Sequence, residues 1–244
     1  MSSRKPFVLV TGASGAIGSA AAVKLAGEGH SLFLHCHSAS EDHMDELAEA
    51  CRSYGAEAYV VRADLSKENG AEILLQQVHS PVSGLVYAAG ASLYGLLQDA
   101  EPEEIMNQFH SHLIQAVFTS QKLLPYMIQE KQGTMVFISS IWASSGTAME
   151  TVYSAAKGGM EAFVRSLAKE AAPSGVKVNA VAPGVIDTPM NGIFTGEERE
   201  DLVAQIPAGR MGRPDEVAEA VAFLFSNSSS YMNGHILQID GGFS

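Results

Sequence analysis

Short apolar segments alternate with amphipathic segments along almost the whole chain. Seven segments rich in β-branched and aromatic residues are typical of strands: residues 7–11, 31–36, 58–64, 84–90, 133–140, 176–184 and 235–242. Other segments repeat apolar residues every three or four positions, as helices do: residues 13–29, 44–55, 103–131 and 215–226. Strands alternating with helices form parallel sheets through right-handed crossovers. The pattern predicts an α/β fold with a doubly wound, seven-stranded parallel sheet and helices on both faces.

The chain is long enough for one such domain. It has 244 residues, 46% of them hydrophobic, with no repeat, low-complexity tract or linker. We therefore expect a single domain over residues 1–244. One segment, residues 188–210, is too long for a plain connection and begins where a strand ends. Ligands of open α/β sheets bind at this edge, so the segment is predicted to be a substrate lid; a surface excursion is the alternative.

Charge and cysteine usage exclude several classes of protein. The formal net charge is −12 and no block of like charges stands out, which argues against a nucleic-acid partner. Cys36 and Cys51 have no metal-ligand spacing, so we expect reduced thiols and no metal. No apolar run reaches the roughly 18 residues of a membrane span, and the N-terminal apolar run is too short for a signal peptide. The expected location is the cytoplasm.

A glycine-rich turn links the first predicted strand to the first helix in VLVTGASGAIGS. Gly12, Gly15 and Gly18 are spaced G-x-x-G-x-x-G, which departs from the common G-x-G-x-x-G of dinucleotide-binding proteins. Glycine lets the backbone approach a pyrophosphate, and the helix N-terminus offers free N–H groups. Directly after an apolar strand, this turn predicts a dinucleotide site.

The end of the second strand indicates which dinucleotide binds. NAD-binding proteins of this architecture commonly place an acid there for the ribose 2′-OH. Here Cys36 stands at that position, followed by HSAS. No carboxylate would repel a 2′-phosphate, and His35, His37, Ser38 and Ser40 are expected to be able to donate to one; ordinary surface polarity is the alternative for the histidines. NADPH is predicted, with NADH left open.

Tyr153 and Lys157 stand four residues apart in the helix-forming segment TVYSAAKGGMEAF. Residues at this spacing share one helix face, so the phenol and the ammonium would point the same way. A tyrosine ionises near pH ~10 when unperturbed, and a nearby cation favours its phenolate form. The spacing therefore favours an acid–base pair, although for the pair alone a solvated helix face is the more common explanation.

Together, TGASGAIG, YSAAK and NAVAPGVIDTPM resemble the motifs of the short-chain dehydrogenase/reductase family. The tail GRMGRPDEVAEAVAFLFSNSSSYMNGHILQIDGG is most similar to the 3-oxoacyl-[acyl-carrier-protein] reductase branch. The resemblance covers nearly the whole chain. It implies a single-domain Rossmann fold, a nicotinamide dinucleotide across the carboxyl ends of the strands, and catalytic roles for the tyrosine and lysine.

The resemblance also implies the site residues. Ser140 would hydrogen-bond the substrate oxygen, Tyr153 would donate a proton, and Lys157 would lower the tyrosine pKa and bind the nicotinamide ribose. Ser139 is the neighbour most easily confused with Ser140. Asp64 would contact the adenine, and Ile186 the carboxamide. The full set of predicted cofactor contacts is Gly12, Ser14, Gly15, Ile17, Gly18, His37, Ser38, Asp64, Leu65, Ala89, Gly90, Tyr153, Lys157, Pro183, Gly184, Ile186 and Thr188.

Four departures from the family pattern stand out. Ala16 replaces a turn glycine and must keep a negative φ, and Gly15 stands where NADP users often carry arginine. Tyr87 and Ala88 replace two asparagines. His112 replaces the catalytic asparagine and is predicted to hold a water near Lys157; a packed helix residue is the alternative. Relatives that bind acyl carrier protein have two basic residues near the entrance. Lys131 stands at the position of one of them, and Ser174 replaces the other.

The expected function is NADPH-dependent reduction of a β-keto substrate, with a 3-oxoacyl group carried on acyl carrier protein during fatty acid synthesis as the leading candidate. An alcohol, sugar or steroid dehydrogenase is the second enzyme hypothesis. A catalytically weak NADP-binding regulatory protein is the hypothesis from a different class. Related reductases are usually tetramers, so a homotetramer is expected; the stripe of apolar residues along 105–117 suits either a core or a partner.

Overall fold

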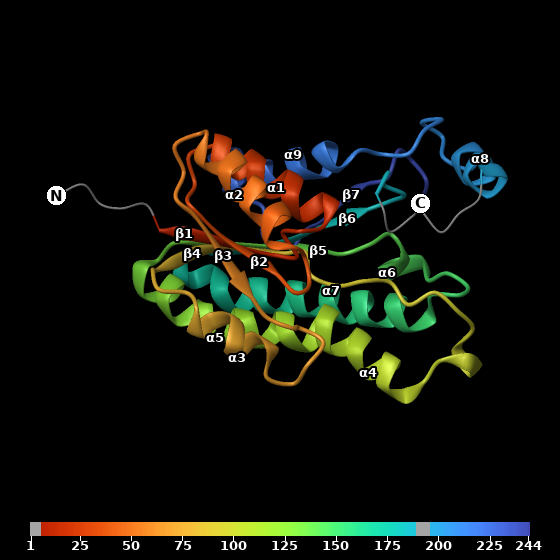
Figure 1. Cartoon of the computed structure of the whole chain (residues 1–244), viewed down its shortest axis with the longest axis horizontal. Helices are drawn as coiled ribbons and strands as arrows, with labels where there is room; N and C mark the ends of the chain where they lie inside the picture. The colour runs from red at the N-terminus through yellow and green to blue at the C-terminus, as the bar shows by residue number, and fades with distance from the viewer. Residues whose placement is uncertain (1–5, 189–195) are drawn as a thin grey trace.

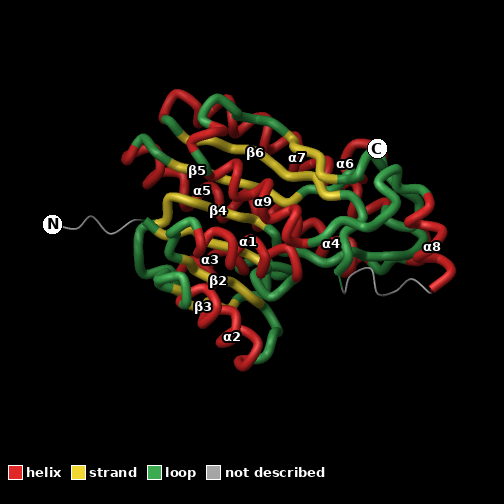
Figure 2. The backbone as a smooth tube through the Cα atoms, turned by 90° about the horizontal axis from the view of Figure 1, so that it is seen from above, coloured by secondary structure: helices red, strands yellow, loops and turns green. Residues whose placement is uncertain are grey.

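The computed structural model of the chain describes residues 6–188 and 196–244. Seven parallel strands form one sheet in the order β3-β2-β1-β4-β5-β6-β7 (Figure 1). The strands are β1 Phe7–Thr11, β2 Leu32–Cys36, β3 Ala58–Arg62, β4 Val82–Tyr87, β5 Gly133–Ile138, β6 Val176–Pro183 and β7 Ile236–Ile239. Seen from above, the labelled strands β3, β2, β4, β5 and β6 follow one another in this order across the sheet (Figure 2). The predicted doubly wound parallel sheet is confirmed.

Two separate cores cover the two faces of the sheet. One core joins the sheet to α1 Ala16–Gly27, α2 Glu41–Arg52 and α9 Pro214–Phe225. The other joins it to α3 Gly70–Gln76, α5 Gln115–Glu130 and α7 Thr151–Ala171. Figure 1 shows these two groups of helices above and below the sheet. Strands such as β1 are buried along their whole length because both faces are covered.

The order of the strands fixes the place of the site. The winding reverses between β1 and β4, which pair directly from Phe7↔Val82 to Thr11↔Tyr87. Ligands of open α/β sheets bind in the crevice outside the carboxyl ends of the strands at such a point. Thr11 and Tyr87 therefore mark the centre of the edge where the site is expected.

The predicted long helix around 103–131 is divided into three parts. It consists of α4 Pro102–Phe109, a π-helical segment at His110–Ile114, and α5 Gln115–Glu130. A π-helical turn accommodates an extra residue, and such turns are frequent at functional sites. The expectation of one continuous helix was wrong because a single inserted turn leaves the apolar spacing on both sides intact.

The region beyond β6 is described only in part. The predicted lid, residues 188–210, includes residues 189–195, which lie outside the described residues. Within the rest of it, α8 spans Gly196–Ala204, and Arg199 forms a 2.8 Å ion pair with Asp187 beside the end of β6. Among the described residues, no helix is long and apolar enough to cross a membrane.

Candidate active site

The glycine-rich turn joins the carboxyl end of β1 to α1 and packs closely against neighbouring backbone. Gly12 adopts φ +65°, and a Cβ there would lie 2.7 Å from the Ala88 carbonyl oxygen. A Cβ at Gly18 would lie 2.1 Å from the Gly12 carbonyl oxygen, so the turn and the helix meet without side chains between them. Gly15 is the N-cap of α1, no side chain caps the helix, and its first turn carries no acid. Such an uncapped N-terminus suits a pyrophosphate.

Ala16, the first residue of α1, is not among the described non-glycine residues with positive φ, so its methyl group is accommodated as expected. Ser14 and Ile17 flank this position. Ile17 packs against the core below α1, and the Ser14 carbonyl lies 3.3 Å from Nε2 of His43 on α2. The turn is thus held between α1 and α2 at the edge predicted to bind the cofactor.

A threonine hydroxyl fixes the neighbouring turn after β4. Oγ1 of the buried Thr11 accepts hydrogen bonds from the backbone N–H groups of Ala88 at 3.1 Å and Ala89 at 3.2 Å. Gly90 follows with φ +136°, and a Cβ there would lie 2.0 Å from the His112 ring. Ala89 and Gly90, two predicted cofactor contacts, therefore lie beside the glycine-rich turn. Thr11 was not among the predicted site residues, although it stands directly before Gly12.

The four polar residues at the end of β2 differ in what they can reach. His37 and Ser38 are exposed, and Nε2 of His37 lies 3.6 Å from a carboxylate oxygen of Asp64. Ser40 is exposed and caps α2 by accepting a hydrogen bond from the His43 N–H. His35, in contrast, is buried inside the sheet with both ring nitrogens engaged. The expectation that His35 donates to a 2′-phosphate was therefore wrong.

The surroundings of this strand end suit the 2′-phosphate of NADP. Cys36 is fully buried, and burial raises the pKa of its thiol, so no anion is present at that position. Two basic groups that sequence reasoning missed lie nearby: His43 on α2, and Arg62, whose guanidinium donates to the Ala39 carbonyl at 2.6 Å. Asp64 accepts hydrogen bonds from the N–H and hydroxyl of Ser66, and Leu65 is buried.

Ser139 and Ser140 directly follow β5 and lie in different environments. The Ser139 hydroxyl donates to the buried carboxylate of Glu161 at 3.0 Å. The Ser140 hydroxyl accepts from the Trp142 N–H at 3.2 Å and interacts with the Tyr153 phenol. Ser140 is therefore the serine that lies beside the predicted proton donor, and Ser139 serves to hold α7 against the sheet.

Tyr153 and Lys157 share one face of α7, directly over the end of β5. Lys157 is buried, its Nζ donates to the Ile138 carbonyl at 2.6 Å, and Nζ lies 5.6 Å from the centre of the Tyr153 ring. Burial raises the pKa of Tyr153 to about 12, and the Ser140 hydroxyl opposes that rise. Burial lowers the pKa of Lys157 to about 7. In this structure burial outweighs the expected effect of the lysine on the tyrosine, so Tyr153 holds its proton at neutral pH.

His112 lies in the π-helical segment, and its ring makes an edge-to-face contact with the ring of Tyr153. The two ring centres are 5.1 Å apart and the planes are nearly perpendicular, at 86°. Nε2 lies 2.9 Å from the Ala91 carbonyl oxygen, whereas the buried Nδ1 has no hydrogen-bond partner among the described residues. Burial, reinforced by the nearby Lys157, lowers the pKa of His112 to about 3. The ring is therefore neutral at neutral pH.

Tyr87, which replaces one of the two asparagines of the family pattern, links β4 to the π-helical segment. Its side chain is fully buried, and its hydroxyl donates to the Ser111 carbonyl at 2.8 Å. Ser111 precedes His112 within the π-helical segment. The tyrosine thus ties the end of β4 to the segment that carries His112, a connection that depends on residues 24 positions apart.

The end of β6 supplies the remaining predicted contacts. Pro183 ends the strand, and a Cβ at Gly184 would lie 2.8 Å from the Asp240 Cα. Ile186 is buried and forms a parallel bridge with Gly212. Thr188 is partly buried at the limit of the described residues. These residues lie at the same edge of the sheet as Ser140.

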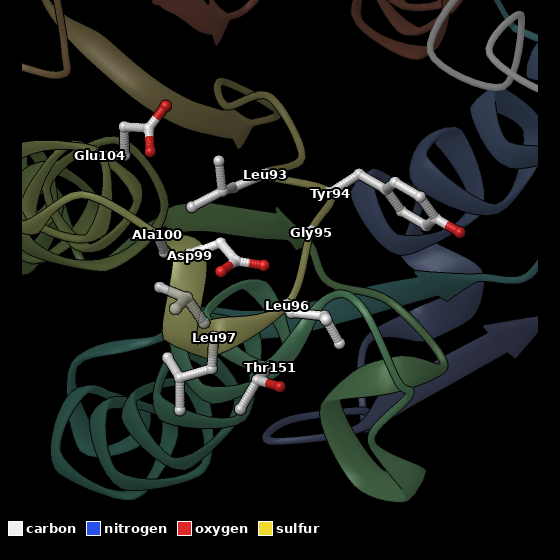
Figure 3. Close-up of a pocket in the computed structure, with 10 residues that line it drawn as sticks. Leu93, Tyr94, Gly95, Leu96, Leu97, Asp99, Ala100, Glu104 and Thr151 are labelled. Atoms are coloured by element: carbon white, nitrogen blue, oxygen red, sulfur yellow. The ribbon is translucent and has the colours of Figure 1, made fainter.

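A cavity of about 250 Å³ opens beside the start of α7. Figure 3 shows it between the loop after β4 and the first residues of α7, with Tyr94 pointing away from the leucines. Aliphatic side chains and two carboxylates line it: Leu93, Leu96, Leu97, Val152, Asp99 and Glu104. Val152 directly precedes Tyr153 on α7, but the lining of the cavity does not include Ser140, Tyr153 or Lys157.

Lys131 and Ser174 lie far from this cluster. Lys131 follows α5 and Ser174 precedes β6, so both lie at the amino edge of the sheet, opposite the edge of Tyr153. The Lys131 carbonyl lies close to Gly175, next to Ser174. Within one chain, therefore, the retained basic residue does not line the predicted entrance. Over the described residues, no group of three His, Cys, Asp or Glu side chains is arranged for a metal ion.

Comparison with known proteins places the chain among oxidoreductases. A family model described as Enoyl-(Acyl carrier protein) reductase matches residues 12–244. The uncharacterized oxidoreductase YmfI of Bacillus subtilis (strain 168) is 42% identical over 235 residues, covering 96% of this chain and 97% of the relative. The 3-oxoacyl-[acyl-carrier-protein] reductase FabG of Aquifex aeolicus (strain VF5) is 35% identical over 240 residues, covering 96% and 95%.

Solved structures agree over the whole fold. A 3-oxoacyl (acyl-carrier-protein) reductase from Agrobacterium tumefaciens C58 with NADP bound superposes with a TM-score of 0.91 at 31% identity, covering 98% of this chain and 94% of that one. Acetoin dehydrogenase from Enterobacter cloacae superposes with a TM-score of 0.88 at 30% identity, covering 99% and 96%. The names of these two neighbours indicate different substrates, so similarity of fold does not identify the substrate of this chain.

Proposed function

The chain belongs to the short-chain dehydrogenase/reductase family, and on that premise we propose that it uses NADPH to reduce a β-keto substrate to the hydroxy product. A 3-oxoacyl thioester carried on acyl carrier protein is the leading substrate class. The observation that carries the proposal is the grouping of Ser140, Tyr153 and Lys157 at the carboxyl edge of the sheet, beside a glycine-rich turn suited to a dinucleotide.

The residues of this chain would each perform one task. NADPH supplies the hydride that the carbonyl carbon accepts. Tyr153 gives the proton that the carbonyl oxygen accepts, and its raised pKa keeps that proton in place until negative charge develops on the oxygen. Ser140 donates a hydrogen bond to the same oxygen. Lys157, held by the Ile138 carbonyl, has a pKa near neutrality and so can return a proton to the tyrosine.

Reduction of a small ketone, or oxidation of the corresponding alcohol, is the second candidate. Two observations favour it: the similarity to acetoin dehydrogenases and the position of Lys131 at the opposite edge of the sheet. The carboxylates of Asp99 and Glu104, which line the cavity beside the start of α7, would also repel the anionic carrier protein or coenzyme A of a thioester substrate that entered there.

The test is a binding titration followed by a substrate panel. Fluorescence titration with NADPH and NADH measures cofactor choice, and NADPH is expected to bind more tightly. Turnover is then compared among 3-oxoacyl thioesters on carrier protein or coenzyme A, diketones, sugars and secondary alcohols. Preference for the thioesters supports the leading function, whereas preference for diketones selects the second candidate. NADPH binding without reduction of any carbonyl would indicate a regulatory cofactor-binding protein.

Tyr153→Phe is the matched control for this panel. The substitution removes the proton donor and keeps the ring, so NADPH binding should persist. Reduction should fall on the order of 10²-fold or more, the usual contribution of a positioned general acid. A wild-type rate in this variant would show that the assignment of Tyr153 is wrong.

We also propose a cytoplasmic homotetramer. The side chains of Met106 on α4 and Phe118 on α5 are 51% and 42% exposed, which supports a partner on this side of the molecule. Sedimentation velocity at several concentrations measures the assembly, and a monomer at all of them would contradict the proposal.

A further inference from the structure

His35 is a buried histidine whose two ring nitrogens both contact backbone. It lies on β2, within the sheet, and is only 2% exposed. Nδ1 accepts a hydrogen bond from the Gly12 N–H at 3.1 Å, and Nε2 lies 3.0 Å from the Ala63 carbonyl oxygen. The backbone carbonyl of His35 also accepts the Ala13 N–H at 2.8 Å. One residue of β2 thus contacts segments from both neighbouring strands.

These contacts specify one form of the ring. The Gly12 N–H can only donate, so Nδ1 must present a lone pair. Nε2 then carries the hydrogen and donates to the Ala63 carbonyl. A protonated ring would place two donors against each other at Gly12. Burial lowers the pKa of His35 to about 4, with His37 lowering it and Asp64 raising it, so the neutral ring is kept at physiological pH.

The charged groups around the ring are occupied elsewhere. Arg62, from β3, donates to the Ala39 carbonyl. Asp64 accepts from Ser66, and His37 points to the other carboxylate oxygen of Asp64. The turn at residues 11–15 contributes no titratable side chain. The ring of His35 is therefore fixed by the two backbone groups.

The two backbone groups belong to opposite parts of the predicted dinucleotide site. Gly12 begins the turn predicted to face the pyrophosphate, and it holds a left-handed conformation against the Ala88 carbonyl. Ala63 directly precedes Asp64, the predicted adenine contact. One imidazole ring thus links the pyrophosphate turn to the adenine wall, in addition to the backbone hydrogen bonds from the Ala13 N–H to the His35 carbonyl and from the Ala63 N–H to the Cys36 carbonyl.

We propose that His35 is a positioning residue for the dinucleotide: its neutral imidazole joins the Gly12 N–H to the Ala63 carbonyl and thereby sets cofactor affinity. It contacts neither the substrate nor the transferred hydride. The proposal rests on the use of a dinucleotide cofactor and is independent of which carbonyl compound is reduced.

The first experiment compares His35→Leu with His35→Asn in the full-length protein. Leucine fills the space and removes both hydrogen bonds, so the NADPH dissociation constant should rise on the order of tenfold or more. Asparagine places an acceptor near the position of Nδ1, keeps the bond to Gly12, and should lose less affinity. At saturating NADPH, kcat should stay within about threefold of wild type in both variants, because the reacting groups are untouched.

The control is His79→Leu. His79 packs edge-on against Phe33 on β2, with ring centres 5.1 Å apart, but does not contact the glycine-rich turn. This variant removes a histidine next to the same strand and should bind NADPH as wild type does. Fluorescence titration gives the affinities, and circular dichroism reports whether each variant is folded. A folded leucine variant with wild-type NADPH affinity would overturn the proposal.

A second measurement needs no variant to fold. The ¹⁵N chemical shifts of histidine rings distinguish the two neutral tautomers. Wild-type protein should show the His35 hydrogen on Nε2 at pH 7, and a hydrogen on Nδ1 would contradict the proposed bond to Gly12. The titration measures NADPH affinity and the chemical shifts report the tautomer of His35. Neither result depends on whether the protein reduces the proposed substrate.

Discussion

His112 has the placement expected of a residue that serves Tyr153 and Lys157 indirectly. Its Nε2–H donates to the Ala91 carbonyl, so the unpartnered Nδ1 is an acceptor buried close to both residues. A neutral imidazole offers one donor and one acceptor, similar in reach to the carboxamide of an asparagine. We infer that His112 can hold a water molecule that returns a proton to Lys157.

Replacement of His112 separates this role from simple packing. His112→Asn should keep substantial activity because the carboxamide retains an acceptor. His112→Leu should lose most of the activity and keep NADPH affinity, since the cofactor contacts are unchanged. Steady-state kinetics and NADPH titration measure the two effects. Equal activity in wild type and a folded leucine variant would show that His112 is a packing residue.

At the residue scale, sequence reasoning predicted what depends on local spacing. Tyr153 and Lys157 lie four positions apart, so one helix brings them together without tertiary information. His35 was misread because its partners, Gly12 and Ala63, are 23 and 28 positions away. A histidine at the end of a strand has the same sequence signature whether its ring faces solvent or backbone.

At the scale of elements, the π-helical segment between α4 and α5 carries one departure from the family pattern, His112, and contacts a second, Tyr87 on β4. Tyr87 supplies a hydroxyl to the Ser111 carbonyl, and Gly90 leaves space for the His112 ring. The three positions therefore form one arrangement: a bulky ring at 112 requires glycine at 90, and tyrosine at 87 holds the segment that carries the ring. The sequence pattern predicted helices here but not this arrangement, since each contact crosses from β4 to the helix.

Tyr87→Phe tests the link between β4 and the π-helical segment. The variant removes the hydroxyl that donates to the part-buried Ser111 carbonyl, which should cost about 0.5–1.5 kcal/mol of unfolding free energy. Activity should fall while NADPH affinity is kept, because His112 is adjacent to Ser111. Urea unfolding and steady-state kinetics measure both quantities. Tyr54→Phe, at a site 60% exposed, is the control; an equal loss of stability in both variants would contradict the prediction.

At the scale of the whole molecule, buried histidines link stability to pH. His35 and His112 have pKa values of about 4 and about 3 in the folded chain, against a usual value of 6.5. Below pH 6.5 the unfolded chain therefore binds protons that the folded chain does not bind until its own pKa is reached. Each histidine should lower stability by roughly 1.4 kcal/mol per pH unit over that window.

The expected result is a fall in the urea midpoint between pH 6.5 and pH 4. His112→Asn removes one of the two titrating groups and should reduce the slope of this fall. Urea titrations of both proteins at several pH values provide the comparison. Identical slopes would show that His112 does not contribute to acid sensitivity.

The separation of the two edges of the sheet has a practical consequence for sensor construction. Every described residue of the predicted site lies toward the carboxyl edge, whereas the turn from α2 to β3 lies at the amino edge. Gly55 in that turn has φ +83°, with open space around an added Cβ. Exposed turns of this kind tolerate inserted domains. A fluorescent protein inserted at Gly55 should leave NADPH affinity within about twofold of wild type, so the chain can serve as a cofactor reporter without obstruction of its own site.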